Sequence, residues 1–128
     1  METIRVSKTG RDKLLKLKRI TSIPTWNVLC RWAFCVSVAE RSSPRDERIP
    51  ADSPLELDWR TFAGDQEATY LALLKERCRR DGIDHSPASL WKQFRLHLHR
   101  GIGYLAGDPN LRGIADLIAL AARAPKSE

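Results

Sequence analysis

The sequence predicts a mainly α-helical protein whose N-terminal part has the order strand, helix, helix. Residues 2–7 alternate apolar and polar side chains, which is typical of a short strand. Residues 8–20 repeat apolar side chains at helical spacing, and residues 25–40 are apolar on nearly every side of a helix. The length of 128 residues predicts a single domain spanning residues 1–128.

The predicted first helix is amphipathic. Ser7 is placed to cap it, after a strand that carries Ile4 and Val6 on one side. Its apolar stripe consists of Leu14, Leu17 and Ile20. Its opposite, mainly basic face consists of Lys8, Asp12, Lys16 and Arg19.

The predicted second helix, residues 25–40, follows a break at Pro24. A helix that is apolar almost all round is buried on most sides. Because one chain of this size does not readily surround such a helix, we expect a subunit interface here.

The order of strand, basic helix, turn and buried helix in residues 1–40 is that of the ribbon-helix-helix proteins. In that architecture the strand pairs with its copy from a second chain, and the strand pair can enter a major groove. A generic helical bundle with a loose N-terminus gives a similar pattern and remains an alternative.

The rest of the chain predicts a proline-rich loop followed by additional helices. The loop covers residues 41–58, and a second short strand is expected where Leu55, Leu57 and Trp59 alternate. The helical part covers residues 59–123. It comprises one helix over 65–81 that stops at Gly82, one that starts after Ser86, and one capped by Asn110.

The net charge of +6 is concentrated in two segments. The first basic segment, residues 1–20, has seven basic and two acidic side chains. The second basic segment, residues 71–100, has seven basic and three acidic side chains. Two such segments in a small basic chain are typical of a protein that binds a polyanion, although a solvated helix face gives the same pattern.

The cysteines do not form a recognisable site. Cys30 and Cys35 lie about 140° apart around a regular helix, so they cannot share a disulfide or a metal ion. We expect both to be small packing residues of a buried helix. Cys78, beside Arg77 and two further arginines, is the better candidate for a lowered pKa, with burial as the alternative.

The remaining patterns also argue against an enzyme. His97 and His99 are two residues apart and face different ways on a helix, which makes them a poor metal pair. The sequence contains no phosphate-binding or dinucleotide-binding glycine motif and no nucleophile elbow. We therefore expect no catalytic residues, no metal and no cofactor. Without a signal peptide or a membrane-spanning run, a cytoplasmic protein is expected.

Several segments together resemble the DNA sulfur modification protein family DndE. They are RVSKTGRDKLLKLKRIT, WNVLCRWAFCVSVAE, DWRTFAGD with YLALLKERC, and LHRGIGYLAG. The resemblance runs from Ile4 to about Gly107, and its first two segments are the most distinctive.

The resemblance implies a role in DNA phosphorothioation, in which sulfur replaces a non-bridging oxygen of the backbone phosphate. It also implies a Met-repressor-like, mainly helical fold and a homo-oligomer, a tetramer in the family. The implied partners are double-stranded DNA, intact or nicked, DndC-type and DndD-type proteins, and a cysteine desulfurase.

We therefore expect a non-catalytic DNA-binding subunit of the phosphorothioation complex. Two alternatives are a scaffold for the DndC and DndD partners without DNA contact, and a DNA-nicking enzyme or thiol carrier. The expected DNA-binding residues are Arg5, Lys8, Arg11, Lys13, Lys16, Lys18 and Arg19.

Overall fold

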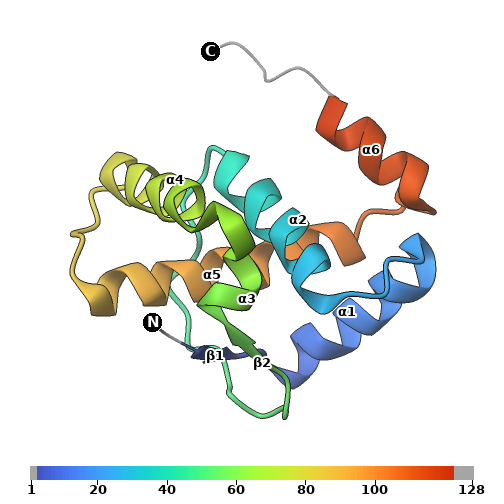
Figure 1. Ribbon diagram of the computed structural model, residues 1–128, viewed down its shortest axis with the longest axis horizontal. Helices are drawn as coiled ribbons and strands as arrows, with labels where there is room; N and C mark the ends of the chain where they lie inside the picture. Colours follow the sequence, from blue (N-terminus) through green and yellow to red (C-terminus); the bar gives the residue numbers. More distant parts are fainter. Residues whose placement is uncertain (1–2, 123–128) are drawn as a thin grey trace.

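The structure is a computed structural model that describes residues 3–122 of the chain. It is mainly helical, with one short two-stranded antiparallel sheet (Figure 1). Its elements follow in the order β1 (Thr3–Arg5), α1 (Lys8–Thr21), α2 (Trp26–Ala39), β2 (Glu56–Asp58), α3 (Trp59–Ala63), the 3-10 turn η1 (Gly64–Gln66), α4 (Glu67–Arg80), α5 (Pro87–Ala106) and α6 (Ile114–Ala122).

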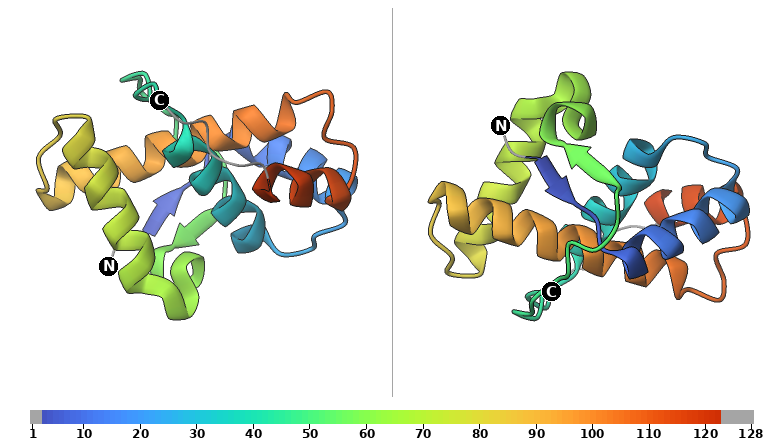
Figure 2. Two further views of the ribbon diagram at one scale, coloured as in Figure 1. Left: turned by 90° about the horizontal axis from the view of Figure 1, so that it is seen from above. Right: turned by 90° about the horizontal axis from the view of Figure 1, so that it is seen from below.

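Helix α5 runs along the length of the molecule and organises the other elements (Figures 1 and 2). Helices α3 and α4 lie toward its start, and α1 and α6 lie toward its end. Helix α2 packs closely on α5, because Gly101 lets the two backbones meet. A β-carbon at Gly101 would lie 1.7 Å from the carbonyl oxygen of Ala33, so no larger residue fits there.

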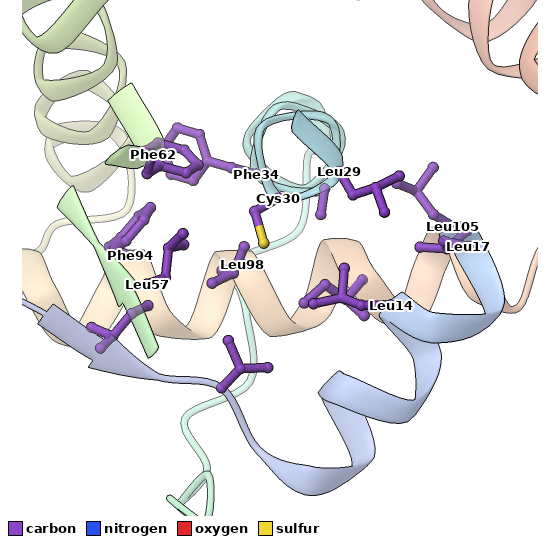
Figure 3. Close-up of a cluster of buried hydrophobic side chains, with 14 of the residues drawn as sticks. Leu14, Leu17, Leu29, Cys30, Phe34, Leu57, Phe62, Phe94, Leu98 and Leu105 are labelled. Carbon is purple, nitrogen blue, oxygen red and sulfur yellow. The ribbon is translucent and has the colours of Figure 1, made fainter. Parts of the chain in front are cut away.

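The core lies between α2, α5 and the surrounding elements (Figure 3). Its centre is aromatic: the ring centroids of Phe34, Phe62 and Phe94 are 4.9–5.6 Å apart. Trp59 extends this cluster, with its ring 5.1 Å from that of Phe94. Edge-to-face packing of this kind adds about 0.5–1.5 kcal/mol per pair beyond the area buried.

The strand β1 was predicted correctly, but its expected partner was wrong. It pairs with β2 of the same chain, in a register that sets Ile4 opposite Leu57. The loop after α2 returns the chain to this position, so that both side chains are buried. The ion pair of Arg5 with Glu56, at 2.9 Å, also links the two strands. The order strand, helix, helix is therefore confirmed, whereas the pairing of this strand with a second chain is not.

Much of the burial of α2 is supplied within one chain, and a subunit interface at this helix stays a prediction. Helix α2 packs against α5, α3, α1 and α4 within one chain. Its central residues, such as Leu29 and Phe34, are fully covered without a partner. A homo-oligomer remains a prediction, but burial of α2 does not require it.

The later elements differ from their predictions mainly at the ends. Trp59 begins α3 and does not continue the second strand. Gly82 ends α4 as predicted, with φ of 73°. Ser86 caps α5 as predicted.

The last helix begins at Ile114 and is not capped by Asn110. The backbone N–H of Asn110 instead donates to Asp108 Oδ1 in a turn. Leu117 of α6 is buried, whereas Ile114 and Ile118 are 51% and 57% exposed. Residue 123, the last of the predicted helical part, lies outside the described residues.

Candidate nucleic-acid interface

Helix α1 packs its apolar face against the core and turns its basic side chains toward solvent. The hydroxyl of Ser7 accepts the amide of Gly10 at 2.9 Å and starts the helix. Leu14 and Leu17 are completely buried against the core. The opposite side, which includes Lys8 and Arg19, therefore faces solvent.

Three of the seven expected DNA-binding residues are held by partners within the chain. Arg5 pairs with Glu56 and donates to the carbonyl of Ser53. Lys16 Nζ donates to the carbonyl of Ala106 at 2.7 Å. Lys18 Nζ lies 4.3 Å from the ring centroid of Trp26, a cation–π contact.

The other four make no side-chain hydrogen bond or ion pair with any residue in the range 3–122: Lys8, Arg11, Lys13 and Arg19. Lys8 and Arg19 lie close to one line along the outer face of α1, about 16 Å apart at 1.5 Å per residue. Lys13 lies on the side of α1 that borders α5. Its Nζ is close to Gly103 of α5, since a β-carbon added to that glycine would lie 3.7 Å from the Lys13 Nζ. These four cations are free to meet phosphate, and we name them the α1 basic surface.

The second basic segment is arranged differently, because its central arginine is internal. Arg77 is 2% exposed and forms an ion pair with Asp81 at 2.9 Å. Its guanidinium also donates to carbonyl oxygens at the end of α2 and in the residues that follow, those of Val38, Glu40, Arg41 and Ser42. A cation at a helix C-terminus satisfies carbonyls that lack partners within the helix.

Most other cations of the second basic segment are also engaged. Arg100 Nε donates to the hydroxyl of Ser37, and Arg100 Nη2 donates to the Ser37 carbonyl. Arg95 donates to the carbonyls of Arg5 and Pro50. Arg79 and Lys92 pair with Glu76 and Asp46, respectively. In the described part of the chain, only Lys75 and Arg80 of this segment lack such a partner.

Both histidines of α5 have structural roles. Burial, together with the nearby charges of Arg100 and Arg77, lowers the pKa of His97 to about 4. The hydroxyl of Ser37 lies 2.8 Å from His97 Nδ1. His99 Nε2 accepts the amide of Ser7 at 3.0 Å, so this ring helps to position the start of α1. Burial also lowers the pKa of His99.

The three thiols have three different environments. Cys30 points from α2 toward Leu98 of α5, and burial raises its pKa to about 12 (Figure 3). Cys78 is also buried, and desolvation raises its pKa, so the lowered pKa considered for it was wrong. Cys35 is exposed in the single chain, so it is not a core residue, and its packing at a subunit interface stays a prediction. Neighbouring atoms still desolvate its thiol and raise its pKa.

Across residues 3–122, no group of three or more His, Cys, Asp and Glu side chains is placed to hold a metal ion. No helix in that range is long and apolar enough to cross a membrane.

Two basic residues outside both segments were missed from the sequence. Arg45 and Arg48 lie in the loop that faces Lys13 across a groove. Asp46 and Glu47 lie between them, so the sequence shows a loop of mixed charge and no excess of basic residues. In the structure Asp46 forms an ion pair with Lys92 at 3.0 Å and not with either arginine.

Comparison with known proteins identifies the family. Residues 3–113 match the family of the DNA sulphur modification protein DndE. The chain belongs to the DndE family. The match includes the proline-rich loop and ends one residue before α6.

Solved DndE structures share the fold. The crystal structure of DndE from Escherichia coli B7A, involved in DNA phosphorothioation modification, is 29% identical with a TM-score of 0.67. The alignment covers 82% of this chain and 96% of that one. A double glycine-to-lysine mutant of a DndE involved in DNA phosphorothioation is 25% identical with a TM-score of 0.65, covering 84% of this chain and 99% of that one. No curated protein sequence matches the chain.

Proposed function

We propose that this DndE-family protein is the non-catalytic DNA-binding subunit of a DNA phosphorothioation complex. The observation that carries the proposal is the α1 basic surface. Its four side chains are free of internal partners, while those of the second basic segment are mostly bound within the fold. Free cations along one helix are what a protein needs to neutralise successive phosphates.

The dimensions of α1 suit a phosphate backbone. Phosphates of one strand follow each other at about 3.4 Å along the duplex axis. The separation of about 16 Å between Lys8 and Arg19 therefore spans several phosphates. Lysine and arginine contacts to phosphate carry no base readout, so affinity should be largely independent of sequence.

A charge-reversal pair with a matched control tests the proposal. Lys8→Glu plus Arg19→Glu should weaken binding to a fluorescent duplex, intact or nicked, by at least about 100-fold in anisotropy titrations at low salt. Lys75→Glu plus Arg80→Glu changes the net charge equally, on α4, and should weaken binding far less. Equal losses in both variants would mean that net charge alone drives binding. Unchanged affinity in the first variant would remove α1 from the interface.

A scaffold for DndC-type and DndD-type partners is a second candidate, favoured by the exposed isoleucines of α6. Ile114 and Ile118 lie one helical turn apart and are both more than half exposed, so they present a small apolar surface on one face of α6. Replacing both by serine should reduce co-purification with those partners, and with the cysteine desulfurase, without changing DNA affinity.

We also propose a homo-oligomer, a tetramer by family resemblance. Light scattering should then give four times the mass of 14.6 kDa of one chain. A monomer mass at micromolar concentration would contradict it.

A further inference from the structure

A groove beside the α1 basic surface has the chemistry of a second binding site. Its volume is about 520 Å³, and it lies between the start of α1, residues 44–50 of the loop and the second half of α5. Buried Leu96 contributes to its base, and exposed Lys13, Arg45 and Arg48 line it from α1 and the loop. We name it the α1–α5 groove.

The α1–α5 groove carries uncompensated positive charge. Lys13, Arg45 and Arg48 make no side-chain hydrogen bond or ion pair with any residue that the structure describes. Glu47 is the one acidic side chain among the residues that line the groove in the described chain. Three free cations against one carboxylate favour an anionic ligand, and the forked guanidinium of arginine matches a phosphate group.

The same groove contains an aromatic surface. Tyr104 lines it and is 41% exposed, which is unusual for a large ring in this otherwise well-packed helix. The guanidinium carbon of Arg100 lies 5.5 Å from the ring centroid. Arg100 is itself held by Ser37 and Ser42, so it restrains the ring from one side. An exposed ring beside cations is the usual platform on which an unpaired base stacks.

We propose that the α1–α5 groove binds an unpaired nucleotide of a DNA strand. The base stacks on Tyr104, and the adjoining phosphates contact Lys13, Arg45 and Arg48. The volume falls in the range of about 300–1,000 Å³ that is typical of pockets for small ligands, which suits a nucleotide and excludes a duplex. An acidic peptide would satisfy the cations, but it would make less use of the exposed ring beside Arg100.

This inference extends the proposed function, because Lys13 belongs to both surfaces. It is one of the four free cations of α1 and also lines the groove. A duplex held on α1 can therefore place an unpaired strand end in the groove, because positively charged side chains continue from one surface to the other. The protein would then distinguish DNA with a locally unpaired strand from a fully paired duplex.

Three fluorescent probes test the groove: a blunt duplex, the same duplex with a short oligodeoxythymidine overhang, and the free oligodeoxythymidine. The overhang should tighten binding about tenfold, the effect of one or two stacked bases. Tyr104→Leu should abolish that gain and leave affinity for the blunt duplex within about twofold. Tyr104→Phe keeps the ring and should keep the gain. Circular dichroism checks that each variant is folded.

The failures of the two proposals are distinguishable. If the overhang adds no affinity, or if Tyr104→Leu keeps the gain, the groove proposal is overturned while duplex binding by α1 stands. If the blunt duplex does not bind, the proposed function fails, and Tyr104-dependent binding of free oligodeoxythymidine decides the groove alone. Tyr104-dependent binding of a glutamate-rich peptide, with no binding of oligodeoxythymidine, would assign the groove to a protein partner and overturn the proposal.

Discussion

The first and second basic segments have nearly the same composition, yet the fold uses them for opposite purposes. In the first segment, four of the seven cations are free on α1. In the second, Arg77, Arg95 and Arg100 point inward and bind backbone carbonyls, and two more cations pair with carboxylates. The comparison teaches that a basic stretch identifies an anion-binding surface only when its side chains have no internal partners.

The largest expected effect is on stability, at Arg77. Arg77→Met leaves Asp81 and four carbonyls without their donor, which typically costs about 3–5 kcal/mol of the free energy of unfolding. Arg80→Met, on the exposed side of the same helix, should change it by less than about 0.5 kcal/mol. Urea denaturation measures both. Similar losses of unfolding free energy in the two variants would mean that buried Arg77 contributes no more to stability than exposed Arg80.

The burial of His97, beside Arg100 and Arg77, predicts how stability depends on pH. His97 is neutral in the fold, and its pKa of about 4 lies below the value of 6.5 for a free histidine. The unfolded chain therefore takes up a proton between about pH 6.5 and 4 that the folded chain does not. The free energy of unfolding should fall as the pH falls through this window, by up to about 1.4 kcal/mol per pH unit.

His97→Gln isolates this contribution. The variant should lose stability at neutral pH, but its unfolding free energy should decline less steeply from pH 6.5 to 4 than that of the wild type. Denaturant titrations at several pH values give both slopes. If the two slopes are the same, His97 does not titrate as its environment requires.

A smaller effect concerns the salt dependence of DNA binding. Lys8→Ala removes one phosphate contact, so the slope of log affinity against log salt should become shallower by about 0.9. Arg80→Ala should leave the slope unchanged, although it removes the same charge. Anisotropy titrations over a range of salt concentrations distinguish the two, and equal slopes for both variants would favour diffuse attraction over contact by α1.

The smallest effects are expected at the thiols. Cys35 is exposed and should react with a thiol reagent in the native protein, slowly because its pKa is raised. Cys30 and Cys78 should react only after unfolding, despite the arginines beside Cys78. Absorbance of the released chromophore counts the reactive thiols. More than one native thiol would show that the second basic segment is more open than its packing indicates.

Prediction from the sequence succeeded where structure is local. The caps at Ser7 and Ser86 and the stop at Gly82 were all placed correctly. Each depends on hydrogen bonds or backbone angles within a few residues, which residue type largely determines. The start of α6 was missed because the turn at Asn110 depends on an equally local competitor, Asp108.

Prediction failed where a partner distant in the chain decides the outcome. Alternation marked β1 as a strand, but no local signal says that Leu57 lies opposite Ile4. The divergence of Cys30 and Cys35 followed from helix geometry, whereas their opposite exposure depends on where α5 packs. Arg45 and Arg48 join Lys13 only because the loop folds back over α1 and α5.

Residue types along the chain were sufficient to predict most of the helices, the caps at Ser7 and Ser86, the amphipathic character of α1 and the resemblance to the family. Periodicity and short-range hydrogen bonding encode these features residue by residue. Which cations are free depends on the three-dimensional fold, because a guanidinium finds its partners among carbonyls and carboxylates that are remote in sequence. Burying such a group costs free energy unless those partners are present, so the fold holds Arg77 inside and leaves Lys8 and Arg19 in solvent.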